Sequence, residues 1–151
     1  MRIEPADLDS RAFAALMAEH QAAMQATAPL ESQHALDLSG LKQAHVRVWV
    51  MHDGDALLGC GALQRLDDAH VEVKAMRTSR AHLRRGVGKT VLAHLLYEAR
   101  AAGYARASLE TGSMDYFAPA RRMYADAGFV ACGPFADYLD DPNSTYMTRA
   151  L

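Results

Sequence analysis

The alternation of apolar and polar residues in the first half of the chain predicts β-strands. Apolar, mostly β-branched or aromatic residues alternate with other residues over 45–51, 56–66 and 70–78, and a period of two is typical of half-buried strands. Two turn-forming pairs, Asp53-Gly54 and Asp67-Asp68, separate these segments. We therefore expect an antiparallel meander of three strands, with Gly59 and Gly61 marking a bulge or a close backbone approach.

Helical patterns precede and follow the meander. Residues 10–28 are rich in Ala, Leu and Met and predict a helix that ends before Pro29, and residues 31–41 predict a second helix. After the meander, six apolar residues recur at helical spacing before a stop at Gly103: Val87, Val91, Leu92, Leu95, Leu96 and Ala99.

The remaining patterns predict that helices and strands alternate toward the C-terminus. Residues 104–110, 129–132 and 146–150 are expected to be strands, 118–127 a helix, and 2–5 a short extended segment. A meander followed by a strand–helix–strand crossover gives a mixed α/β sheet with helices packed on it.

Composition indicates a single soluble domain over residues 1–151. Half of the residues are hydrophobic, 23% are charged and the formal net charge is −2, so neither a nucleic-acid-binding nor a membrane-binding basic surface is expected. No apolar run approaches the roughly 18–20 residues of a membrane span, and the N-terminal residues do not resemble a signal peptide. Cys60 and Cys132 are too few for a disulfide framework or a zinc site. We therefore expect a cytoplasmic protein without a metal.

The glycine-rich turn over 83–90, between a strand and a helix, predicts an anion-binding site. Gly86 and Gly88 allow close approach to the backbone, and the first N–H groups of the following helix have no intrahelical partner. Arg84, Arg85 and Lys89 add positive charge, which suits a phosphate or pyrophosphate. The structural alternative is a tight turn followed by a solvated basic helix.

Three phosphate-binding motifs compete for this turn. Gly88-Lys89-Thr90 matches the end of a P-loop, but that motif requires glycine at position 83, which is Leu83. The dinucleotide fingerprint fails because Val91 replaces its third glycine. The third motif, Q/R-x-x-G-x-G/A, matches Gly86 and Gly88.

With this loop motif the chain resembles the GNAT superfamily of acetyltransferases over nearly its whole length. Residues 120–129 match a later motif of that superfamily, A-x-x-x-Y-x-x-x-G-F, with Tyr124 at the tyrosine position. Two positions depart from the family pattern. Leu83 replaces the usual Gln or Arg, so that charge would come from Arg84 or Arg85, and Phe117 replaces an Asn that commonly contacts the pantetheine arm.

The resemblance implies a mostly antiparallel, mixed sheet of six to seven strands with helices on both faces. It also implies acetyl-CoA as a co-substrate and a primary amine, of a small molecule or a peptide, as the acceptor. A homodimer is compatible with the fold. The family pattern assigns the pantetheine arm to Met76, Arg77 and Thr78, and the pyrophosphate to Arg84, Arg85, Gly86, Val87, Gly88, Lys89 and Thr90.

Acyl transfer to an amine needs a base, because a free alkyl amine has a pKa near 10.4 and is protonated at neutral pH. Glu72 is the first candidate, since period two places it on one strand face with Lys74 and Met76, opposite Val71, Val73 and Ala75. Glu110, at the end of the adjacent parallel strand, is the second candidate, and water alone is the third. A solvent-facing strand carboxylate is the structural alternative for Glu72.

The resemblance assigns the remaining steps to Tyr124 and to the backbone. Tyr124 would protonate the departing thiolate, and a backbone N–H near Met76 would stabilise the oxyanion. Five further residues lie in segments that often border the acceptor cleft of this fold: His34, Asp37, Tyr116, Asp137 and Tyr138.

Two rival functions stay open. A catalytically inactive acyl-CoA-binding sensor or interaction module would use the same loop, and a P-loop nucleotide enzyme is a more distant alternative. Cys60 and Cys132 lie in apolar strand contexts without an adjacent base, which favours buried structural cysteines over nucleophiles.

Overall fold

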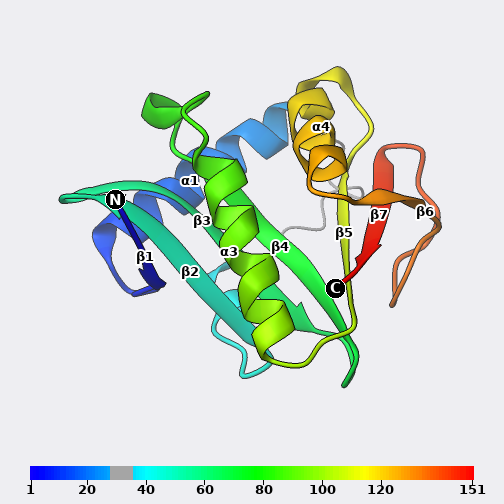
Figure 1. The fold of residues 1–151 in the computed structure, drawn as a ribbon. Coiled ribbons are helices and arrows are strands. Elements are labelled where there is room, and N and C mark those ends of the chain that lie inside the picture. The colour runs from blue at the N-terminus through cyan, green and yellow to red at the C-terminus, as the bar shows by residue number, and fades with distance from the viewer. Residues whose placement is uncertain (28–35) are drawn as a thin grey trace.

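The computed structural model describes residues 1–27 and 36–151, and its central feature is a seven-stranded mixed sheet (Figure 1). The strands follow the order β1-β2-β3-β4-β5-β7-β6. Every neighbouring pair is antiparallel except β4 and β5. The strands are β1 (Arg2–Pro5), β2 (Val46–Asp53), β3 (Ala56–Arg65), β4 (His70–Thr78), β5 (Arg106–Gly112), β6 (Val130–Cys132) and β7 (Ser144–Ala150).

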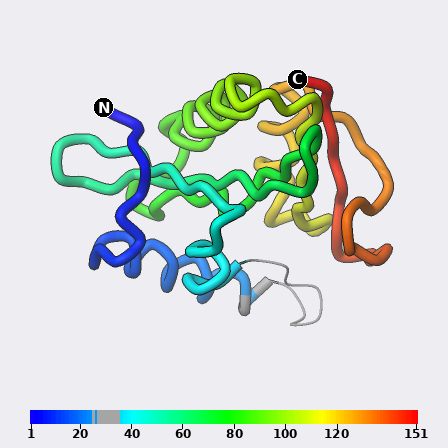
Figure 2. Tube along the Cα trace, turned by 90° about the horizontal axis from the view of Figure 1, so that it is seen from below, coloured from blue at the N-terminus to red at the C-terminus, as the bar shows by residue number. Residues whose placement is uncertain are grey.

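Helices cover both faces of the sheet, as expected. Figure 2 shows the sheet edge-on, with the helix that follows β4 on one side and the N-terminal helix on the other. The helices are α1 (Arg11–Thr27), α2 (Leu38–Leu41), α3 (Val87–Ala101) and α4 (Ala118–Asp126), with 3-10 turns η2 (Arg80–His82) and η3 (Asp115–Phe117).

The predicted meander and crossover are confirmed, and element bounds shift by one or two residues at most ends. Of the helix predicted over 31–41, the structure shows only α2, which begins where Asp37 Oδ1 accepts a hydrogen bond from the Gly40 amide at 2.8 Å. Residues 28–35, which include His34 and the predicted helix end before Pro29, lie outside the described residues.

Two hydrophobic cores lie on opposite faces of the sheet. The larger core packs α3 and α4 against one face and contains Val71, Val73, Leu92 and Leu95. The second core packs α1 and α2 against the other face and contains Phe13, Leu16, Leu41 and Cys60. Membership of one core or the other therefore shows which face each apolar side chain of β4 occupies.

The only parallel pair described, β4 with β5, separates after a short paired segment. His70, Glu72 and the residue between them pair with residues 106–108. Beyond that segment β5 pairs with β7 up to Gly112, while β4 continues to Thr78 paired only with β3 among the described residues. The backbone of β4 from residue 73 onward therefore faces an opening in the middle of the sheet.

A β-bulge in β4 overturns part of the predicted side-chain alternation. Lys74 pairs with Ala62, and the next pair is Arg77 with Cys60. Between these two pairs the chain advances three residues along β4 but only two along β3, so β4 carries one extra residue. Ala75 at the bulge has φ 55°. Ala75 packs with the α1-side core and Met76 with the α3-side core. The prediction that Met76 shares a face with Glu72 is therefore wrong, because the extra residue reverses the alternation.

Gly59→Ala is expected to destabilise the fold by about 1–3 kcal/mol, as overpacking does. A Cβ on Gly59 would lie 2.6 Å from the Arg77 carbonyl oxygen and 2.8 Å from Val87 Cγ1. The carbonyl belongs to a paired strand and cannot move independently. Urea denaturation measures the loss. Gly133→Ala is the matched control, because its Cβ meets nothing within 4 Å, and equal stability losses in the two variants would contradict the close approach at Gly59.

Candidate active site

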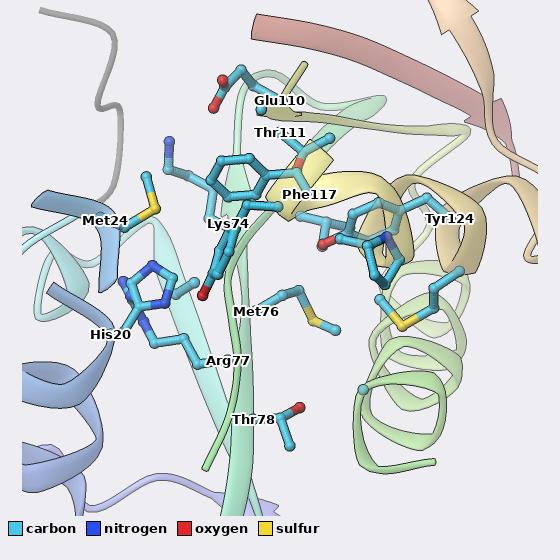
Figure 3. A pocket seen from close by; sticks show the side chains of 18 of the residues that line it. His20, Met24, Lys74, Met76, Arg77, Thr78, Glu110, Thr111, Phe117 and Tyr124 are labelled. Carbon is cyan, nitrogen blue, oxygen red and sulfur yellow. The ribbon is translucent and has the colours of Figure 1, made fainter. Parts of the chain in front are cut away.

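The opening between β4 and β5 is a cleft of about 650 Å3. Figure 3 shows side chains entering it from α1, from β4 and β5, and from the segment that includes Phe117 and Tyr124. The turn over 83–89 closes the end next to α3. The glycine-rich turn, the end of β4 and the two predicted carboxylates, Glu72 and Glu110, therefore all line one cleft.

The turn before α3 forms an uncapped helix N-terminus. Gly86 is the N-cap residue, with φ 78° and without a side-chain cap, so the first-turn N–H groups of α3 are available to an anion. Arg84 and Lys89 line the cleft beside them. Arg85 and Thr90 are exposed and are not among its lining residues; the Thr90 hydroxyl donates to the Gly86 carbonyl at 2.9 Å.

The predicted pantetheine segment lies on the cleft wall. Met76, Arg77 and Thr78 all line it. A Cβ on Gly88 would lie 3.0 Å from Met123 Sδ and 3.7 Å from Thr78 Oγ1. Gly88 also lines the cleft, at the point where β4, α3 and α4 converge, whereas Gly86 has the left-handed backbone that starts the helix.

Glu72 is buried, with 3% of its surface exposed, and is not the solvent-facing strand carboxylate of the structural alternative. Its Oε2 accepts hydrogen bonds from the Tyr138 hydroxyl at 2.6 Å and from the Lys74 ammonium at 3.3 Å. Lys74 also donates to the Tyr138 hydroxyl at 3.0 Å. Among the described residues no donor reaches Glu72 Oε1, so this oxygen can accept a proton from the cleft.

Tyr124 lies at the opposite wall, on α4, and is buried rather than exposed. Its ring packs edge-to-face on Phe129, with centroids 5.9 Å apart. Burial, together with the negative charge of Glu110, raises the pKa of Tyr124. Its hydroxyl therefore keeps its proton at neutral pH, as a proton donor must.

Glu110 lies among three tyrosines at the end of β5. Its charge contributes to the raised pKa values of Tyr124, Tyr138 and Tyr146, in each of which burial is the larger cause. Glu110 lines the same cleft as Glu72, so the structure brings together both carboxylates that the sequence indicates.

The two departures from the family pattern both have a place in the cleft. Leu83 lines it with 54% of its surface exposed. The Phe117 ring lies directly over Gly112, where any Cβ would overlap it. Arg121 fixes this corner by donating to the carbonyls of Gly112 and Met114 at 2.7 and 2.9 Å.

Of the residues expected to border the acceptor cleft, Tyr116 and Tyr138 line it, whereas Asp37 caps α2 and Asp137 is not a lining residue. The lining residues to which sequence reasoning assigned no site role include His20, Lys74 and Asn143. Only Lys74 carried a signal, since it lies two residues after Glu72 on one strand.

Cys60 is buried, as expected, whereas Cys132 is only partly buried. Cys60 is fully buried, its Sγ–H donates to the Ala75 carbonyl at 3.2 Å, and burial raises its pKa to about 12. Burial also raises the pKa of Cys132. Within residues 1–27 and 36–151, the side chains form no cluster suited to a metal ion, and no helix has the length and apolar character to cross a bilayer.

Comparisons with known proteins agree with this geometry. The sequence model of the acetyltransferase (GNAT) family matches residues 13–129. YsnE of Bacillus subtilis strain 168, called an uncharacterized N-acetyltransferase, is 50% identical over 100% of both chains. A putative acyl-CoA N-acyltransferase from Klebsiella pneumoniae has a solved structure with a TM-score of 0.79 and 26% identity, covering 99% of this chain and 97% of that one.

A second solved structure, of the putative acetyltransferase yncA from Salmonella typhimurium, holds its cofactor acetyl-CoA. It has a TM-score of 0.72 and 21% identity, and the match covers 99% of this chain and 92% of that one. The fold is shared throughout, and the matched family model and the 50% identical relative cover most or all of the sequence. The chain thus belongs to the GNAT acetyltransferase family and is an acyl-CoA-dependent N-acetyltransferase with acetyl-CoA as its co-substrate.

Proposed function

We propose that this enzyme acetylates a primary amine of a small molecule or peptide, with Glu72 as the base and Tyr124 as the acid. The observation that carries the proposal is the shared cleft. An uncapped helix N-terminus, a carboxylate with one open oxygen and a protonated phenol all face it. A cytoplasmic location and homodimerisation stay predictions.

The residues of the cleft fit acetyl-CoA. The α3 N-terminus with Arg84 and Lys89 would hold the pyrophosphate. The β4 backbone that separates from β5 would pair with the amide groups of the pantetheine arm. When bound, acetyl-CoA supplies the thioester that the amine attacks and the thiolate that leaves.

Glu72 would remove the proton from the incoming ammonium group. Oε2 is held by two donors, Tyr138 and Lys74, so the carboxylate is fixed while Oε1 accepts the proton, directly or through water. Glu110 lies in the same cleft and is the competing candidate.

Tyr124 would donate its hydroxyl proton to the leaving sulfur. Because burial raises the pKa of Tyr124, the phenol carries at neutral pH the proton that this role requires. A backbone N–H near Met76, beyond the point where β4 loses its β5 partner, would hold the oxyanion in place.

A screen of amines, amino acids, polyamines and peptides for CoA release tests the proposal. Turnover with any amine supports it. Tight binding of acetyl-CoA without turnover of any acceptor would favour the sensor module, and magnesium-dependent ATP binding without CoA binding would contradict both.

Gly86→Val is expected to weaken CoA binding by at least about tenfold, or about 1.4 kcal/mol. A branched Cβ at φ 78° strains the turn, and it would obstruct a phosphate on the α3 N-terminus. Isothermal titration calorimetry measures the affinity.

Gly103→Val is the matched control for Gly86→Val. Gly103 follows the other end of α3, has φ 90° and also meets nothing within 4 Å, so it carries comparable strain without contact to the cleft. A folded Gly86→Val protein with wild-type affinity would place the phosphates elsewhere.

Glu72→Gln is expected to lower kcat/KM by roughly 10²–10⁴-fold at neutral pH, the usual contribution of a general base. Glutamine keeps the acceptor oxygen for Tyr138 and Lys74 but cannot take a proton. The deficit should shrink as the pH approaches the amine pKa of about 10.4, where the amine deprotonates by itself. A pH–rate profile of Glu72→Gln beside Glu110→Gln separates the two carboxylates, and a wild-type profile for Glu72→Gln assigns the role to Glu110 or water.

Tyr124→Phe is expected to lower kcat by about tenfold, or about 1.4 kcal/mol of barrier, with CoA affinity near normal. The ring and its packing on Phe129 survive. The deficit should be smaller with a thioester of a more acidic thiol, because that leaving group needs less protonation. Tyr97→Phe, exposed on α3, is the control; equal deficits with both thioesters would show that Tyr124 positions the substrate instead.

A further inference from the structure

Arg77 is a buried cation that forms no ion pair with the described residues. It is 6% exposed and lines the cleft. Among the described residues it forms no ion pair, and its buried Nε has no hydrogen-bond partner. Burial lowers the pKa of Arg77 to about 10. Buried charges cost free energy unless they are paired, so a role with a bound ligand explains this arginine better than a structural one.

The bulge at Ala75 decides which part of the cleft Arg77 faces. Arg77 lies opposite Cys60, a member of the α1-side core, and direct cross-strand neighbours share a face. Figure 3 shows the Arg77 side chain running from β4 toward the helix that carries His20 and Met24. It therefore shares the face of Glu72 and Lys74, opposite the α3 side of the sheet.

The anionic parts of acetyl-CoA have cations of their own. The α3 N-terminus, Arg84 and Lys89 lie at the turn on the other side of β4. Lys74 is already paired with Glu72 at 3.3 Å. Among the described residues that line the cleft on the Glu72 face of β4, Arg77 is a cation without an ion pair.

We infer that Arg77 binds a carboxylate of the acyl acceptor, so that the enzyme selects amines that also carry a carboxylate. A guanidinium offers donors in a planar fork that matches the two oxygens of a carboxylate. Its rigid position on a paired strand, beside the face that holds the proposed base, would orient the amine toward Glu72. This inference rests on the proposed acetyl transfer and names the class of its acceptor.

The test compares amino acids of increasing chain length, each with its own carboxamide, which keeps the amine and removes the negative charge. Binding to the CoA-loaded protein is measured by calorimetry, and turnover by CoA release. For the best pair, the wild-type enzyme should favour the acid by about 10- to 100-fold, the effect of hydrogen bonds to a charged group. Equal affinity and turnover for acid and amide throughout the series would overturn the inference, even where amines are acetylated.

Arg77→Met keeps most of the aliphatic stem and removes the guanidinium. It should abolish the discrimination between acid and amide. The amide rate and the CoA affinity are measured beside it, because the Arg77 backbone belongs to the predicted pantetheine segment. The melting temperature of the variant should be equal or higher, because an unpaired buried charge is removed. Arg77→Lys should recover part of the discrimination. Arg100→Met, at the exposed end of α3, is the matched control and should change nothing.

Two outcomes assign Arg77 elsewhere. A loss of CoA affinity in Arg77→Met with retained acid preference would place a CoA phosphate on it. A lower melting temperature with unchanged preference would make it a structural residue. If the wild-type protein binds CoA and distinguishes acid from amide but transfers no acetyl group, the proposed function fails and the carboxylate site stands.

Discussion

The architecture of the site depends on one limit to backbone pairing, the short parallel contact between β4 and β5. Three residues of β4 pair with three residues of β5. Beyond them β5 pairs with β7, and β4 pairs with β3. Separation leaves β4 hydrogen-bonding groups without a strand beside them, at the position where the cleft opens. The sheet is held on both sides of this point by antiparallel pairs and by two cores, so the opening follows from the strand pairing itself.

The β4 bulge acts within that opening and assigns side chains to its two sides. Without the extra residue, Met76 would lie on the face of Glu72, and Arg77 would point at α3. With the extra residue, Met76 packs against the α3-side core. Arg77 then lies on the α1 side of the sheet, together with Glu72 and Lys74. Cys60 supports the distortion, since its thiol donates to the Ala75 carbonyl at the bulge. One irregular residue thus separates the part of the cleft assigned to CoA from the part assigned to the acceptor.

Much of this could be predicted from the chain itself. The period-two segments and the apolar spacing of α3 locate the meander and the crossover, and the glycine turn locates the uncapped helix N-terminus proposed to bind an anion. The prediction that Gly59 and Gly61 mark a bulge or a close approach is confirmed, since the register shifts between Cys60 and Ala62. The extra residue on β4 could not be located from the sequence, because Ala75, with φ 55°, is an ordinary strand residue. Nor could the hydrogen bond of Tyr138 to Glu72, since 66 residues separate the two partners. Glu72 was indicated by its place on the strand, whereas its burial depends on contacts with distant segments.

The interrupted pairing also bears on how the protein avoids aggregation. A strand with unsatisfied backbone groups invites another chain to pair with it, and most proteins protect such edges with charges, prolines or a covering loop. Here the exposed part of β4 lies inside the sheet, between β3 and the β5–β7 pair, rather than at its outer border. An approaching polypeptide would have to enter the cleft past α1 and α4, whereas a slender ligand with amide groups has to displace only water. The same geometry that admits an extended cofactor therefore protects the strand from intermolecular β-pairing.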